Sequence, residues 1–65
     1  MEEKAKDSIT IGSGENWIHK ALLDNGELVI YSYEYGEKRS IVLGREETSN
    51  LLDLLYNNRD EILKH

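Results

Sequence analysis

The sequence has 65 residues and leaves room for one small domain, because a chain of this length buries only about 60% of the surface that its unfolded form exposes. It contains no cysteine, which excludes a disulfide framework, and two histidines alone do not make a structural zinc site. The net charge of -5 opposes general affinity for nucleic acid or anionic membrane. No apolar run approaches the roughly 20 residues that span a bilayer. We therefore expect a cytoplasmic domain without membrane, metal or cofactor.

The first sixteen residues divide into a tail, a strand and a loop. Residues 1–7 are charged and aperiodic, without the apolar stretch of a signal peptide, and are expected to form a flexible tail before a single domain at residues 8–65. Alternating β-branched residues predict a first strand at residues 8–11, and the glycines at residues 12–16 predict a loop.

Three further strands are predicted by apolar runs and turn residues. The runs at 17–23 and 28–35 flank Asn25-Gly26, a dipeptide typical of a type I′ hairpin turn. Gly36-Glu37 predicts a second two-residue turn, of type II′, which leads into a strand at 39–43. The two turns together predict the register of an antiparallel sheet.

From residue 45 onward the apolar residues follow a helical period. Gly44 is a candidate cap, and Glu46 and Glu47 suit the positive end of the helix dipole. The fold class is therefore α+β, with a curved antiparallel sheet of three to four strands followed by one C-terminal helix packed on one face. The apolar arc is wider than one sheet contact needs, which favours a homodimer. The expected interface residues are Leu52, Leu54, Tyr56 and Leu63.

Because side chains alternate along a strand, the predicted register sorts the residues onto two faces. The helix is expected to cover the aliphatic face, which has His19 and Ser32 near its middle and a Glu34–Arg39 ion pair at its margin. The residues of this aliphatic face are Ala21, Leu23, Leu28, Ile30, Ile41 and Leu43. The residues of the opposite face, here called the tyrosine face, are Ile18, Lys20, Leu22, Val29, Tyr31, Tyr33, Tyr35, Lys38, Ser40 and Val42.

One helix cannot cover both faces of a sheet, so the tyrosine face is predicted to be an interaction surface. The plainer interpretation is that tyrosine is a good strand former that tolerates half-exposure. Residues 17–45 hold four acidic and four basic side chains, so the acidity of the chain resides outside the sheet.

A series of short motifs follows the order of the predicted strands and helix: Leu28-Val29-Ile30, Glu34-Tyr35, Ser40-Ile41-Val42-Leu43, Glu46-Glu47 and leucines at 51 and 55. In this order the chain resembles, over about residues 16–65, the transcriptional-coactivator family of the positive-cofactor-four type, relatives of the whirly fold. The resemblance implies a dimer that binds single-stranded nucleic acid on the sheet side opposite the helix. This chain differs from the family in having Tyr31, Tyr33 and Tyr35 where family members line the groove with lysine and arginine.

No catalytic motif is present in the sequence. His19 has no carboxylate partner placed by sequence, and Gly12-Ser13-Gly14 lacks the Lys-Ser/Thr that follows a phosphate loop. We therefore expect a non-enzymatic module, a homodimer that docks on another protein as an inhibitor or regulator through its tyrosines. The alternative is single-stranded nucleic-acid binding on the same face, and a weaker alternative is a small-ligand sponge. The candidate binding residues are Lys20, Tyr31, Tyr33, Tyr35, Lys38, Arg39 and Arg45.

Overall fold

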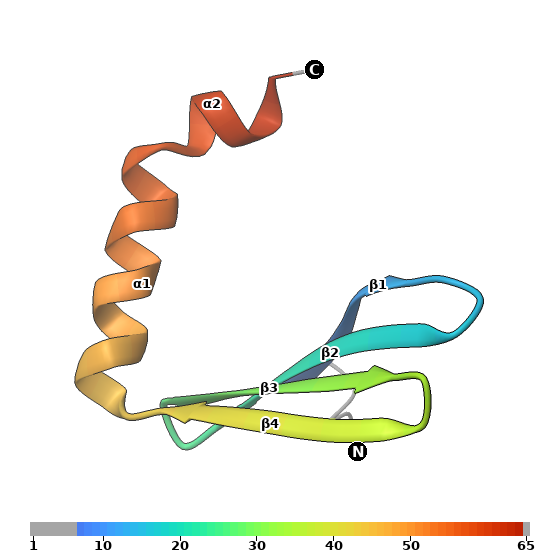
Figure 1. Cartoon of the computed structure of the whole chain (residues 1–65). Helices are drawn as coiled ribbons and strands as arrows, with labels where there is room; N and C mark the ends of the chain where they lie inside the picture. The colour runs from blue at the N-terminus through green and yellow to red at the C-terminus, as the bar shows by residue number, and fades with distance from the viewer. Residues whose placement is uncertain (1–6, 65) are drawn as a thin grey trace, which may run out of the picture.

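The computed structural model describes residues 7–64 and contains one four-stranded antiparallel sheet followed by two helices (Figure 1). The strands are hydrogen-bonded in chain order, so the sheet is a meander with β1 and β4 at its two open edges. This arrangement confirms the α+β fold class. The elements are β1 (Ser8–Ser13), β2 (Trp17–Asp24), β3 (Glu27–Glu34), β4 (Glu37–Leu43), α1 (Arg45–Asn57) and α2 (Arg59–Leu63).

The hairpin between β2 and β3 has the predicted turn and the predicted register. Asn25 and Gly26 occupy the turn with φ angles of 58° and 87°, the left-handed pair that a type I′ turn requires. Asp24 lies opposite Glu27, and the pairing continues without a break to Ile18 opposite Tyr33.

The turn between β3 and β4 lies one residue earlier than the sequence indicates. The residues with positive φ are Tyr35 (49°) and Gly36 (83°), so Glu34 faces Glu37 and the prediction of a Gly36-Glu37 turn is wrong. Both turns have glycine at the second central position, where the left-handed conformation carries no Cβ penalty. The correction moves β4 by two residues along β3, which leaves every strand residue on the face predicted for it.

Strand β1 is longer than predicted because it continues through the first glycine of the expected loop. It pairs with β2 from Ser8 to Ser13, with a bulge between Thr10 and Gly12. The connecting loop is reduced to residues 14–16, and the N–H of Gly14 donates a 2.9 Å hydrogen bond to the carbonyl oxygen of Trp17. The indole of Trp17 lies close to Gly12 and Gly14, which have no side chain to occupy the same space.

Three polar contacts fix the start of α1. Gly44 is the N-cap, and its N–H donates a 3.0 Å hydrogen bond to the Glu47 carboxylate. The Thr48 hydroxyl oxygen accepts a hydrogen bond from the Leu28 N–H at 3.1 Å, which joins the first helical turn to β3. Arg45 donates from Nε to the carbonyl oxygen of Asn25 at 2.9 Å. The first turn of α1 is therefore held against the end of the β2–β3 hairpin.

The helical region breaks at Asn58, which has φ -118° and ψ 23°. Its N–H bonds the carbonyl oxygen of Leu55 at 3.2 Å, and its side-chain amide bonds that of Leu54 at 2.8 Å. These bonds satisfy carbonyl groups left free by the end of α1, so the chain can change direction into α2. His65 and residues 1–6, most of the predicted flexible tail, lie outside the described residues.

The helix does not lie along the sheet within one chain. Helix α1 contacts β3 and β4 near its beginning and then extends away from them, so that a wide space separates it from β1 and β2 (Figure 1). The expectation that the helix covers the aliphatic face is therefore wrong for the single chain, because the contacts of Thr48 and Arg45 set a different direction. Ala21, 8% exposed, is the one buried side chain among residues 7–64.

Candidate binding surface on the tyrosine face

A hollow lies on the tyrosine face of the sheet. Its volume is about 460 Å³, and strands β1 to β4 all contribute to its walls. Four of the predicted binding residues line this hollow together: Lys20, Tyr31, Tyr33 and Lys38. Its remaining described lining residues are Ser8, Ile18, Ala21, Leu22 and Ser32.

The register explains how these four residues meet. Lys20 of β2 lies directly opposite Tyr31 of β3, and Lys38 of β4 lies directly opposite Tyr33 of the same central strand. The two phenol rings are two residues apart on one strand, which places them about 7 Å from each other on the same face. Each ring therefore has one lysine as its cross-strand neighbour, on opposite sides of β3.

The two tyrosines are accessible to a partner. Tyr31 is 39% exposed and Tyr33 is 50% exposed, so each ring has one side against the sheet and one side open. A half-exposed aromatic ring offers a large rigid contact area at a low cost in side-chain entropy. This is the geometry of a stacking or docking platform.

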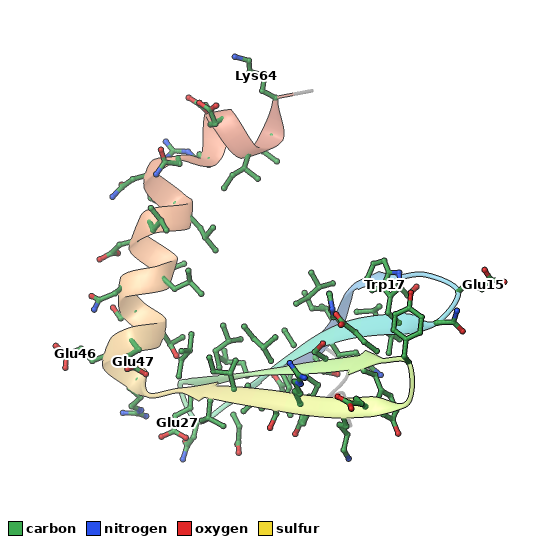
Figure 2. All side chains as sticks on the ribbon, in the orientation of Figure 1. Glu15, Trp17, Glu27, Glu46, Glu47 and Lys64 are labelled. Atoms are coloured by element: carbon green, nitrogen blue, oxygen red, sulfur yellow. The ribbon has the colours of Figure 1, made fainter. Side chains whose placement is uncertain are left out.

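The hollow is basic although the whole chain is acidic. None of the described residues that line it carries a carboxylate, and two of them are lysines. The nearest acidic pair on the same face by register is Asp24 opposite Glu27, at the hairpin end of the sheet. Figure 2 shows Glu27 beside that hairpin turn, on the other side of the sheet from Trp17. Acid and base are therefore separated along the tyrosine face.

Three predicted binding residues lie outside the hollow. Tyr35 belongs to the β3–β4 turn, is 78% exposed and borders a smaller hollow of about 270 Å³ with Ser32, Glu34, Glu37 and Arg39. Arg39 projects on the aliphatic side of the sheet, opposite Ser32, and forms a 3.4 Å ion pair with Glu37. Arg45 is bonded to the β2–β3 turn. The structure thus brings two of the three predicted tyrosines and two of the four predicted basic residues together around one hollow.

The aliphatic side carries a polar cluster that the sequence reasoning missed. His19 Nε2 lies 3.0 Å from Glu34 Oε2, so Glu34 pairs with this histidine and the predicted Glu34–Arg39 pair does not form. Ser32 Oγ lies 3.5 Å from the same carboxylate oxygen. The serine and the histidine both face the carboxylate and do not bond to each other, which is not a nucleophile–base arrangement. The diagonal His19–Glu34 contact was open to prediction, because the predicted β2–β3 register places His19 opposite Ser32, two residues from Glu34.

The predicted interface residues of the helices are all exposed in the single chain. Leu52 and Leu54 project from α1 without burial, and Tyr56 stacks under the guanidinium group of Arg59, 4.3 Å from the ring centroid. Leu63 of α2 is likewise exposed. Apart from Arg59 over the Tyr56 ring, nothing within residues 7–64 covers these side chains.

Within the described part of the chain, no group of three metal-ligating side chains comes together, and neither helix is long and apolar enough to cross a membrane. Comparison with protein-family models, with curated proteins and with solved structures gave no match to this chain.

Proposed function

We propose that the chain is a non-enzymatic module that binds single-stranded nucleic acid on the tyrosine face. The observation that carries this proposal is the pairing of each exposed ring with a lysine, Lys20 with Tyr31 and Lys38 with Tyr33, around one hollow. An aromatic ring offers a surface on which any base can stack, and a lysine beside it neutralises the adjacent phosphate.

The charge distribution favours this ligand over the protein partner that the composition indicated. Attraction of a polyanion depends on the local potential, and none of the described lining residues of the hollow is acidic. The net charge of -5 lowers the affinity without removing the site, because the sheet segment is balanced and the excess acid lies before and after it. We therefore expect weak binding that is clearest at low ionic strength.

The test is a fluorescence anisotropy titration of the full chain with a labelled single-stranded thymidine oligonucleotide of about 16 nucleotides. Two phosphate contacts predict that log K falls with log salt concentration with a slope of about -1.4. Replacing Tyr33 by alanine is expected to weaken binding by about 1–3 kcal/mol, whereas Tyr33→Phe retains the stacking surface.

Tyr35→Ala is the matched control, since this tyrosine is also exposed but lies in the β3–β4 turn, outside the hollow. It is expected to leave the affinity unchanged. Absence of any anisotropy change at low salt, with the folded chain in excess, would contradict the proposal. Equal losses for Tyr33→Ala and Tyr35→Ala would contradict the assignment of the site.

A second candidate is docking on a basic protein as a regulator, and it rests on the opposite end of the same face. Asp24 and Glu27 lie directly opposite each other, an arrangement of like charges that slightly destabilises a strand pair. Glu46 and Glu47 follow in the first turn of α1. A basic partner would relieve this repulsion. The Asp24→Asn variant separates the two functions, because it should strengthen oligonucleotide binding slightly and weaken docking on a basic protein.

A further inference from the structure

Two apolar surfaces of this chain are not covered by any part of residues 7–64, and they face the same open space. One is the aliphatic face of the sheet, where Leu23 and Ile41 are about half exposed, as is Ile9 of the neighbouring β1. The other is the apolar side of α1, to which Leu52 and Leu55 belong. In Figure 2 carbon-only side chains of the helix and of the upper side of the sheet, on which Trp17 lies, point into the space between them.

The exposed area is larger than the average for a folded monomer of this mass. The chain exposes 5615 Å², whereas a monomer of 7.5 kDa is expected to expose about 4,200 Å². The radius of gyration is 13.5 Å against about 10.7 Å for a compact chain of this length. The excess is about 1,400 Å² per chain, or about 2,800 Å² for two chains. Obligate homodimers bury about 2,000–5,000 Å² in total, so the excess has the size of such an interface.

We propose that a second copy of this chain covers both surfaces, in a two-fold dimer in which α1 of each copy lies on the aliphatic face of the other. Each chain has an aliphatic sheet face on which no helix packs and a helix whose apolar side packs on no sheet. Within one chain these two surfaces are kept apart by the Thr48 bond to Leu28 and the Arg45 bond to Asn25. A two-fold axis covers both surfaces at once, because α1 of each copy then packs on the sheet of the other copy.

The charges of α1 agree with this arrangement. At 100° per residue, Leu51, Leu52, Leu54, Leu55 and Tyr56 occupy one side of the helix. Asn50, Asp53 and Asn57 occupy the other side. No charged side chain of the middle of α1 is buried when its apolar side meets a second sheet. The tyrosine face remains outside the contact, because it lies on the opposite side of the sheet.

The first experiment is the mass of the unmodified full chain in solution without nucleic acid, measured by sedimentation equilibrium. The expected mass is about 15 kDa, twice that of the chain. Leu52→Glu places a charge in the proposed contact and is expected to weaken association by about 30-fold or more. Asn50→Glu adds the same charge to the polar side of the same helix and is expected to leave the mass unchanged.

The second experiment tests the exchange itself and uses the absence of cysteine from the sequence. The single variants Ile41→Cys and Leu55→Cys are mixed and oxidised, and a disulfide between an Ile41→Cys chain and a Leu55→Cys chain is expected. A monomeric and cooperatively folded unmodified chain would overturn the proposal, as would a dimer equally sensitive to both glutamate variants. Cross-links between two Leu55→Cys chains alone would also overturn it, because they report helix pairing without coverage of the sheet. These results are independent of the anisotropy titration, so the two proposals fail separately.

Discussion

The indole of Trp17 lies so close to Gly14 that a Cβ at this position would come within 2.7 Å of the ring atom Cε2. The ring also contacts the position of Gly12 and lies 4.9 Å from the imidazole of His19, centroid to centroid. The β1–β2 loop is therefore shaped around one aromatic side chain.

This packing predicts that Gly14→Ala displaces the indole and destabilises the fold by about 1–3 kcal/mol, the usual consequence of overpacking. Urea denaturation followed by tryptophan fluorescence measures both the stability and the new environment of the ring. Gly12→Ala is the control, since a Cβ there would lie 3.5 Å from the nearest atom of the same ring, an ordinary contact, and the backbone is not left-handed. A similar loss of stability in the two variants would show that the indole is not the cause.

The two hairpin turns allow backbone strain to be separated from a side-chain clash. Gly26 and Gly36 both have left-handed φ angles, 87° and 83°, so alanine is strained at either position by about 1–2 kcal/mol. A Cβ on Gly26 would also lie 2.8 Å from Arg45 Nε, whereas a Cβ on Gly36 meets nothing within 4 Å. We expect Gly26→Ala to destabilise the chain more than Gly36→Ala in chemical denaturation. Equal effects would mean that the arginine side chain moves away freely.

Tyr35, in the β3–β4 turn, has a left-handed backbone conformation that is unfavourable for a tyrosine. It has a φ angle of 49°, which is uncommon for a bulky residue and common for asparagine. Tyr35→Asn is expected to raise the free energy of unfolding by about 0.5–1 kcal/mol, because Asn-Gly is the preferred type I′ pair. The reciprocal change, Asn25→Tyr, should lower it by a similar amount. Both values come from thermal or urea unfolding, and a destabilising Tyr35→Asn would indicate that the phenol ring makes a stabilising contact.

The Thr48 hydroxyl connects three parts of the chain. It accepts from the Leu28 N–H and lies 3.1 Å and 2.8 Å from the carbonyl oxygens of Leu43 and Gly44. Thr48→Val keeps the shape and removes these bonds, which should destabilise the fold by about 1–3 kcal/mol because a part-buried N–H loses its acceptor. Amide hydrogen exchange at Leu28 is expected to accelerate. Thr48→Ser retains the hydroxyl and should retain the protection at Leu28; loss of protection there would contradict this account.

The strand alternation and the Asn25-Gly26 turn made the two faces of the sheet predictable. Lys20, Tyr31, Tyr33 and Lys38 were assigned together because a residue's face depends only on whether it is an odd or even number of positions along its strand. The actual turn, Tyr35-Gly36, lies one residue before the predicted one and displaces β4 by two residues along β3. Because two is an even number, every residue of β4 stays on its predicted face. The left-handed tyrosine was not predictable from local preference, since bulky residues seldom adopt this conformation.

The direction of α1 and the role of Arg45 were beyond sequence reasoning for a different reason. Helical periodicity identifies an apolar side of the helix but not which surface covers it. The hinge contacts of Arg45 and Thr48, which send the helix away from its own sheet, are tertiary. Arg39 is a candidate binding residue by its charge, although the predicted register already places it on the aliphatic side of the sheet, where the structure pairs it with Glu37.

The bulge in β1 affects whether the open edges of this sheet can pair with strands of other copies. A free strand edge is a template for another strand, and repeated edge pairing leads to fibrils. The bulge between Thr10 and Gly12 interrupts the hydrogen-bonding row of one edge, and the charged start of β4, from Glu37 to Arg39, lines the other. Straightening β1 by deleting Ile11 would therefore remove a safeguard, and such a chain should form thioflavin-binding aggregates sooner than the original.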